Sequence, residues 1–264
     1  MKKYGFLLKW QLAFKVGAIA LIFSGVKFIF IITGLEIFNV NPFLPSLLAG
    51  TVVLLGFLLA GVMADFKESE KIPTEIASTL RNIYDEGLYV KELKKEFDLG
   101  KLRSNVHRIV TSFLNEIGNG NRVENTLKEI TLLNGSFLDM DRLNMPPPYL
   151  ARLKNEQGTL RRIILRANYI KANSFVVVAY IVAMIASAIM LIFLLLLKTE
   201  PAIEGIAVLF AIAFLLIYLL LLIRDMDDPF EFVEDGTPAF TADVNPSQLY
   251  DLKRELELTE KNSP

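Results

Sequence analysis

The sequence holds few side chains that could carry out chemistry. It has no Cys and a single His, His107, which lies in the basic stretch KLRSNVHRIV. Without Cys there is no disulfide, no thiolate nucleophile and no cysteine-ligated zinc. HExxH, GxSxG and Walker phosphate-binding motifs do not occur in the sequence either. We therefore expect His107 to be a surface or packing residue, and the protein not to be an enzyme.

An acidic cluster is the strongest candidate for binding a ligand. Between Asp225 and Asp243 there are seven carboxylates and no Lys or Arg. Several carboxylate oxygens suit a hard cation such as Ca²⁺, although the spacing is not that of an EF-hand loop. The alternative is a solvated acidic segment that pairs with the basic stretch 152–171. The candidate cation-binding residues are Asp225, Asp227, Asp228, Glu231 and Asp235; the identity of any metal stays open. We expect no cofactor unless this cluster binds calcium.

Lys27 is the only charge deep inside a long apolar stretch. It precedes Gly34 by seven residues, so its ammonium lies about 10 Å along a helix from that end. Charges inside membranes are costly and often functional, and a cation here could attract anions. The alternatives are that the side chain extends toward the membrane surface or pairs with an acidic residue.

Apolar stretches of membrane-spanning length must position these groups. Hydrophobic residues make up 53% of the 264 residues and charged residues 22%, and the two kinds are segregated along the chain. Four spans are predicted, at 12–35, 43–64, 175–197 and 205–223. The first follows a basic start but has no cleavage site, so we interpret it as a retained helix.

Short connectors pair these spans into two hairpins, giving segments 1–64, 65–173, 174–223 and 224–264. Segment 65–173 holds 18 Lys and Arg, whereas the connectors hold only Lys198 against Glu36, Glu200 and Glu204. Basic residues favour the cytoplasmic side. The sequence therefore predicts a multi-pass protein of the cell membrane with both termini and segment 65–173 in the cytoplasm.

Segment 65–173 has the pattern of packed helices. Apolar residues recur at helical spacing from Ile76 to Phe97 and from Val106 to Ile117. A third helix is expected over about 123–133, and a basic helix from Tyr149 toward the third span. After the fourth span, an amphipathic helix is expected over 250–258, with Phe230 docking the chain back on these helices. The predicted fold class is all-α.

The second span offers a candidate pore. It has no charge over 43–64, and its helical pattern continues without a break to Pro73. One face carries Ala49, Val53, Phe57 and then Ala60. Under rotational symmetry such a row would form stacked apolar rings, a constriction that gates by dewetting. The alternative is a plain membrane helix whose small residues serve packing.

This layout resembles the bestrophin-like superfamily of membrane proteins. Two motifs carry the resemblance, ADFKESE at the end of the second span and DMDDPF after the fourth, the latter followed by ADVNPSQLY. The resemblance implies a pentameric anion (chloride) channel with the second helix lining the pore at Ala49, Val53, Phe57 and Ala60. It also places a calcium-binding turn at the DMDDPF motif.

From both lines of reasoning we expect a homo-oligomer that conducts small anions and contacts membrane lipids but no nucleic acid. The alternative is a non-conducting membrane scaffold or signalling protein whose segment 65–173 binds a partner. A secondary transporter fits less well, because no inverted repeat or broken helix pair is evident.

Overall fold

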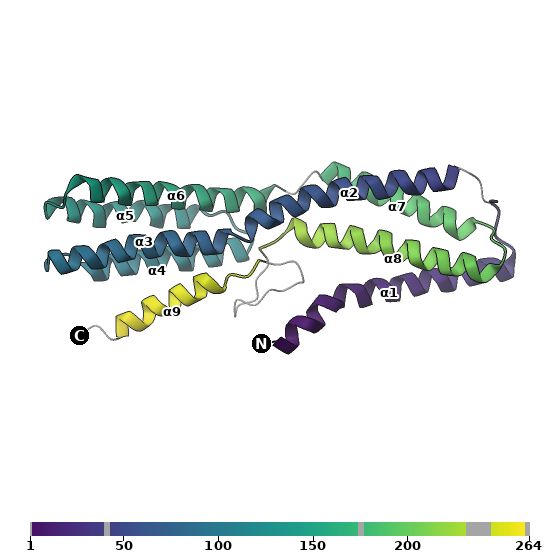
Figure 1. Cartoon of the computed structure of the whole chain (residues 1–264), viewed down its shortest axis with the longest axis horizontal. Helices are drawn as coiled ribbons and strands as arrows, with labels where there is room; N and C mark the ends of the chain where they lie inside the picture. The colour runs from purple at the N-terminus through teal and green to yellow at the C-terminus, as the bar shows by residue number, and fades with distance from the viewer. Residues whose placement is uncertain (1, 40–42, 174–176, 231–243, 262–264) are drawn as a thin grey trace. The chain divides into compact units, whose positions relative to one another are not determined.

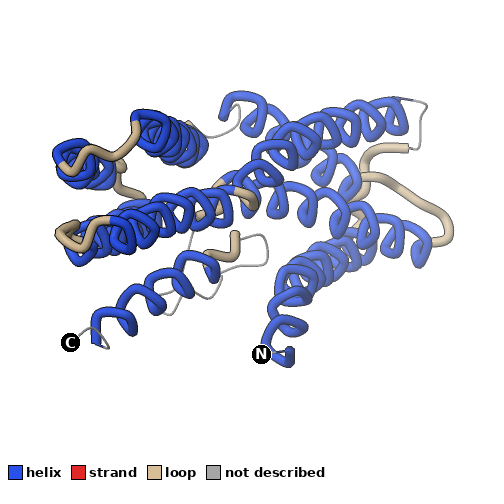
Figure 2. Tube along the Cα trace, turned by 60° about the vertical axis from the view of Figure 1, so that its left-hand side comes forward, coloured by secondary structure: helices blue, strands red, loops and turns tan. Residues whose placement is uncertain are grey.

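A computed structural model describes residues 2–39, 43–173, 177–230 and 244–261, and each regular element in these ranges is a helix (Figures 1 and 2). The only extended pairing there is an isolated parallel bridge between Phe38 and Leu197. The predicted all-α class is confirmed. The helices are α1 (Lys2–Thr33), α2 (Phe43–Ser69), α3 (Ile72–Leu93), α4 (Leu99–Gly118), α5 (Glu124–Arg142), α6 (Pro147–Ala172), α7 (Val177–Leu196), α8 (Ala202–Asp227) and α9 (Ser247–Lys261).

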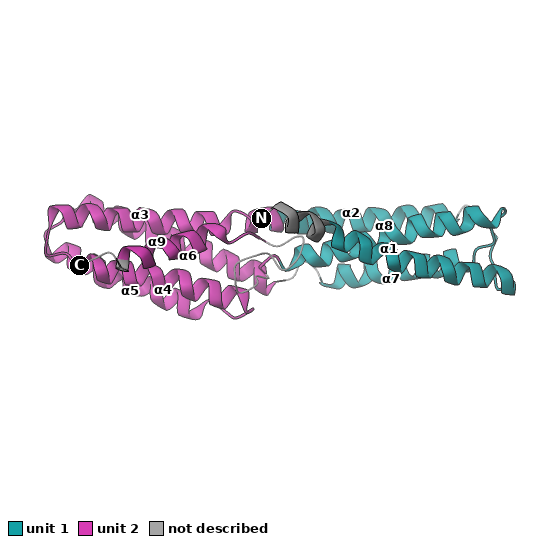
Figure 3. Cartoon of the chain, turned by 90° about the horizontal axis from the view of Figure 1, so that it is seen from below, with its two compact units in different colours: residues 1–65, 174–228, 240–242 teal, residues 66–173, 229–239, 243–264 magenta. Residues whose placement is uncertain are grey.

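The chain divides into two units, which Figure 3 shows in different colours. The apolar unit comprises Met1–Asp65, Ser174–Asp228 and Phe240–Ala242, and it holds α1, α7, α8 and α2 as far as Asp65. The polar unit comprises Phe66–Asn173, Pro229–Ala239 and Asp243–Pro264 and holds α3 to α6 and α9. Each unit is described separately below.

The apolar unit holds helices long enough to cross a membrane. The described residues contain four such stretches, which include Trp10–Thr33 of α1, the first part of α2, all of α7 and all of α8. Helix α1 packs along α8, and α7 contacts both. Small side chains lie buried on these helices, among them Ala20, Ala183 and Ala213, and small residues let membrane helices approach closely. The expected four membrane-spanning helices are confirmed. Helix α1 ends at Thr33 instead of position 35, and residues 175 and 176 of the third predicted span lie outside the described residues.

The polar unit is a helical bundle around one apolar core. Its helices bury large side chains at helical spacing, for example Ile76, Leu80 and Ile83 of α3 and Ile109 and Phe113 of α4. Burying one such side chain contributes roughly 1.5–3 kcal/mol. The amphipathic pattern in the sequence therefore has its expected cause, a shared core against which each helix lays one face.

The C-terminal ends of α3 and α5 differ from the expectation. Helix α5 extends to Arg142 instead of ending near 133, because Phe137 and Met140 continue its buried face and outweigh the cost of Gly135 inside the helix.

Helix α3 ends at Leu93 although the apolar pattern continues to Phe97. The chain turns at Lys94, and Phe97 is buried in this turn. Asp98 then caps the N-terminus of α4, because its side chain accepts a 2.9 Å hydrogen bond from the Lys101 amide.

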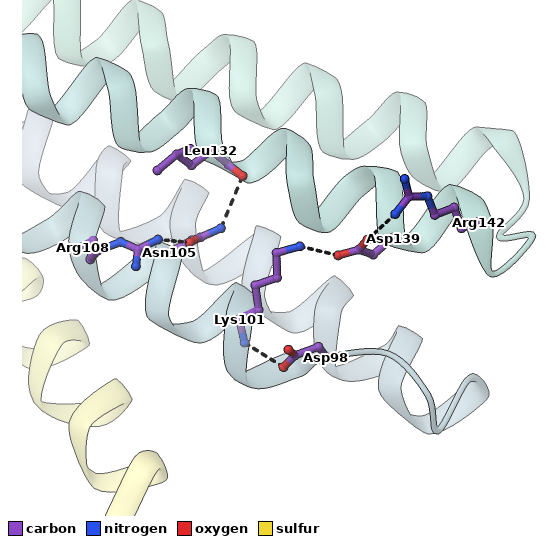
Figure 4. A network of polar contacts seen from close by, with 7 residues as sticks. All are labelled: Asp98, Lys101, Asn105, Arg108, Leu132, Asp139 and Arg142. Atoms are coloured by element: carbon purple, nitrogen blue, oxygen red, sulfur yellow. Dashed lines mark hydrogen bonds and ion pairs between the residues drawn. The ribbon is translucent and has the colours of Figure 1, made fainter.

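Polar side chains join α4 to α5 alongside this core (Figure 4). Lys101 Nζ lies 2.5 Å from Asp139 Oδ2, and Asn105 donates to the Leu132 carbonyl at 3.4 Å. Asn105 also accepts a hydrogen bond from Arg108, which pairs with Glu129. These contacts are directional, so they fix how α4 and α5 are aligned along their length, which apolar packing alone does not do.

The chain beyond α8 docks onto the polar unit. Phe230 is fully buried in its core, and the Pro229 carbonyl accepts a 2.8 Å hydrogen bond from the Val244 amide. Helix α9 is longer than the expected 250–258 and packs against α3 and α4 through Leu249, Leu252 and Leu256. The expectation that Phe230 docks the chain onto this bundle is confirmed.

Candidate pore-lining face

Helix α2 has one face that is buried within the single chain. Thr51, Leu55, Leu58 and Val62 recur every three to four residues, and each is buried. Thr51 donates its hydroxyl to the Leu47 carbonyl at 2.9 Å, so this polar group is satisfied within the helix itself. This row is the packing face of α2.

The predicted row lies on the other side of α2. Ala49, Val53, Phe57 and Ala60 are all exposed, Val53 by 56% and Phe57 by 72%. At about 100° of rotation per residue, the mean directions of the exposed and buried rows differ by about 170°. Every side chain of the predicted row therefore points away from the helices that pack against α2 in the same chain.

The chemistry of the exposed row is apolar throughout. No charged residue occurs between Phe43 and Ala64, and Gly50 and Gly56 leave open space beside the row. Several copies of such a face around an axis would present rings of valine and phenylalanine, which expel water from a narrow passage. The face has the properties of a hydrophobic constriction and also those of a lipid-facing surface.

Lys27 has an acidic partner. The residue is fully buried on α1, and its ammonium lies 2.5 Å from Glu36 Oε1 and 3.2 Å from the Leu195 carbonyl, with the Leu197 carbonyl as a third acceptor. All three ammonium donors are thus used, and the contacts satisfy carbonyls that the end of α7 would otherwise leave open. The structure does not bring this buried cation together with the exposed row of α2.

Gly34 makes the Lys27–Glu36 pair possible. Its φ of +67° ends α1 in the left-handed conformation that glycine adopts readily, and the Leu35 amide reaches back to the Phe30 carbonyl at 3.0 Å. The chain then reverses, and the Ile37 and Phe38 amides donate to the Leu196 carbonyl. Sequence reasoning treated Glu36 only as a connector charge, although the Gly34 turn signal and the nine-residue spacing were visible.

The acidic cluster is described only in part. Asp225 and Asp227 lie in the last turn of α8, and Asp228 follows as its C-cap. Glu231 and Asp235 lie outside the described residues. Within the described part, no group of three or more His, Cys, Asp or Glu residues gathers as a metal site. Calcium binding by the whole cluster stays a prediction.

Two arginines of α6 form ion pairs inside the polar unit. Arg166 holds Glu68 through two contacts of 2.8 and 2.6 Å, and Arg152 lies 2.6 Å from Glu86. The hydrogen bonds and charge of Arg166, with Lys71 nearby, lower the pKa of the Glu68 carboxyl below its ordinary value. His107 lies near the surface of α4 and contacts Glu257 of α9 at 3.1 Å.

Comparison with known proteins identifies the fold. No family model and no curated protein matches the sequence. Crystal structures of a bacterial bestrophin homologue from Klebsiella pneumoniae match with TM-scores of 0.78, 0.77 and 0.76, at 12%, 12% and 13% identity. The matches cover 95%, 95% and 90% of this chain and 99%, 99% and 96% of those chains.

The protein is therefore an integral membrane protein with a bestrophin-like fold, as the sequence motifs indicated. The likeness extends over nearly the whole of both chains, so both units take part in it. At this level of identity the likeness concerns the fold.

Proposed function

We propose that the protein is a homo-oligomeric, bestrophin-like channel that conducts small anions such as chloride along an axis lined by α2. The observation that carries the proposal is the exposed row Ala49, Val53, Phe57 and Ala60, which lies opposite the packing face of the same helix. One chain offers four spans and uses the inward face of α2 for its own packing. The outward face becomes a pore only when copies assemble around it.

Helix dimensions are compatible with an assembly of about five copies. With about 10 Å between neighbouring helix axes, five helices in a ring lie about 8.5 Å from the symmetry axis, and a helix radius of about 5 Å leaves a passage of about 3.5 Å radius. The same arithmetic leaves only about 1 Å for three helices. The small residues Gly50, Gly56 and Ala60 support close contact between neighbouring copies.

The orientation follows from the charge distribution. We propose that the connectors 36–42 and 198–204 face outside and that the polar unit lies in the cytoplasm of a cell-membrane protein, since basic residues are concentrated in segment 65–173. A cysteine introduced at Lys198, which is exposed, should react with an impermeant thiol reagent added to intact cells. Labelling only after lysis would reverse the orientation.

The absence of native cysteine makes a direct test of the pore possible. Single variants Val53→Cys and Phe57→Cys are reconstituted in liposomes, and chloride efflux is measured before and after a cationic thiol reagent is added. We expect modification at either position to change efflux severalfold, because a bulky charge enters the constriction. Phe28→Cys is the matched control, since Phe28 is an exposed aromatic on α1, and its modification should leave efflux unchanged.

Two outcomes would contradict the proposal. One is chloride efflux no faster than from protein-free liposomes, combined with a monomer in mild detergent. That result would favour the alternative of a membrane scaffold whose polar unit binds a partner. The other is efflux that responds equally to modification at positions 28, 53 and 57, which would separate conduction from α2.

A further inference from the structure

A groove of about 410 Å³ opens in the apolar unit near the α7–α8 connector. Its apolar wall comes from Leu44 and Leu48 at the start of α2, Leu194 near the end of α7, and Val208 and Ile212 in the first part of α8. These helix ends meet at the right-hand side of Figure 1. Because all three helices belong to candidate spans, this wall lies within reach of membrane lipid.

The groove exists because the packing face of α2 loses its cover toward the start of the helix. Leu44 and Leu48 continue the row of Thr51, Leu55 and Leu58 at the same spacing. Leu55 is fully buried, whereas Leu48 and Leu44 are only half-buried. The packing face of α2 is therefore left open from Leu44 to Leu48, which is about one and a half helical turns.

Polar groups of the α7–α8 connector line the mouth of the groove. Lys198 and Glu200 lie 3.7 Å apart, and the exposed carboxylate of Glu204 has no ion-pair partner among the described residues. The Thr199 hydroxyl oxygen is buried and likewise has no hydrogen-bond partner in the described part of the chain. Gly205 lets Thr199 fold over α8, because a Cβ at position 205 would collide with that hydroxyl.

We propose that this groove binds a phospholipid whose headgroup carries a primary amine. One acyl chain covers Leu44, Leu48 and Leu194, the ammonium donates to Glu204, and the phosphate lies near Lys198 and Thr199. A primary ammonium can donate hydrogen bonds to carboxylates, whereas a choline headgroup cannot. The volume suits part of one lipid, and charges of both signs at the mouth match a zwitterionic headgroup. The site is separate from the proposed conduction row.

Native mass spectrometry of the delipidated full chain tests the headgroup preference. The probe is an equimolar mixture of phosphatidylethanolamine, phosphatidylcholine and phosphatidylglycerol. We expect phosphatidylethanolamine to be retained severalfold over the other two, and Glu204→Gln to abolish that preference. Glu92→Gln, at an exposed carboxylate of the polar unit, is the matched control and should keep it. Equal retention of the three lipids by the unmodified chain would overturn the proposal.

Fluorescence quenching locates the lipid. In a Trp10→Phe background, Val208→Trp reports from the groove and Ile203→Trp from an exposed position near the same end of α8 that does not line it. Brominated phosphatidylethanolamine should quench position 208 at a severalfold lower mole fraction than brominated phosphatidylcholine does, and should quench position 203 without preference. Quenching at 208 without headgroup preference, or no quenching because a second copy of the chain covers the groove, would contradict the proposal.

Discussion

The two units bury different kinds of residue at the same helical spacing. The middle of α4 in the polar unit buries Val106, Ile109, Val110 and Phe113, and the polar Asn105 and Glu116 are buried at either end of this row. Helix α1 of the apolar unit buries Val16, Ala20, Ser24 and Lys27. In water, burial of large apolar side chains drives folding. In a membrane the surroundings are as apolar as the interior, so close packing and polar contacts distinguish the inside from the outside.

This difference implies that an exposed apolar face has opposite meanings in the two units. On the polar unit it would mark a surface that seeks a partner. On the apolar unit it is the default, since Phe14, Ile22 and Ile32 of α1 are also exposed. The outward row of α2 must therefore be tested by function and symmetry, because hydrophobicity alone does not distinguish a pore from a lipid contact. Four predictions test the comparison, in order of decreasing expected effect.

Truncating an aromatic side chain should be costly where it is buried in the polar unit and nearly neutral where it is exposed on the apolar unit. Phe113→Ala in the polar-unit core should lower the free energy of unfolding by about 3–5 kcal/mol, because it removes a fully buried ring. Phe14→Ala, at an aromatic that is exposed on α1, should change it by less than about 0.5 kcal/mol. Denaturant titration of the full chain in mild detergent measures both. Equal losses would remove the contrast between the units.

Lys27 should behave as half of a buried pair. Lys27→Met leaves Glu36 without its cation and should lower the free energy of unfolding by about 3 kcal/mol or more. The double variant Lys27→Met with Glu36→Gln should recover most of the loss, since replacing both partners leaves no buried charge. Denaturation with sodium dodecyl sulfate in mixed micelles provides the comparison. A double variant as unstable as the single one would show that the pair itself is not what Lys27 contributes.

Glu116 should matter as a cap contributed by another helix. Its carboxylate accepts hydrogen bonds from the Asn125 amide at 2.9 Å, the Thr126 amide at 2.9 Å and the Thr126 hydroxyl at 2.6 Å. The residue before α5 offers no side-chain cap of its own. Glu116→Ala should therefore cost about 1–3 kcal/mol, measured by thermal unfolding. Glu124→Ala, in the first turn of α5, is the control and should cost less than about 1 kcal/mol; a similar loss for both would contradict the capping role.

The smallest expected effect is that of the surface pair Glu68–Arg166. The pKa of Glu68 is lowered from its ordinary value of 4.5, so the folded state favours the carboxylate. The pair therefore stabilises the fold above that ordinary value, and the contribution is lost as the pH falls through the folded pKa. Both side chains are well exposed, so Glu68→Gln should cost well under about 1 kcal/mol at pH 7. The thermal shift caused by Glu68→Gln should shrink as the pH is lowered below 4.5, and a shift that does not change with pH would exclude the ion pair as its cause.

The sequence predicted the fold well where solvent makes a clear pattern. The alternation of Ile76, Leu80 and Ile83 with charged residues indicated a helix, because a helix at the surface of a water-soluble bundle buries one apolar face and exposes a polar one. The spans were recognisable from length and lack of charge. The break at Pro73 was placed within a few residues, since α2 ends at Ser69 and α3 begins at Ile72.

The candidate pore-lining face was harder to predict, because the sequence of α2 shows no difference in hydrophobicity between its buried and its exposed side. Residues 43–64 are apolar on every side, so hydrophobicity could not separate Val53 from Leu55. Only the packed chain shows Leu55 buried and Val53 exposed. The contacts of Lys27 depend on the turn at Gly34 and on the carbonyls of Leu195 and Leu197, which lie 168 and 170 residues further along the chain. Every residue has a backbone carbonyl, so the sequence does not show which carbonyls accept these hydrogen bonds.

The central claim is that the outward face of α2 lines an axial pore. Cryo-electron microscopy of the full chain in lipid nanodiscs tests it most directly, because it gives the number of copies and the direction of each face together. We expect a closed ring of about five copies with Val53 and Phe57 facing the symmetry axis. A monomer, or a ring in which Val53 and Phe57 face lipid, would contradict it.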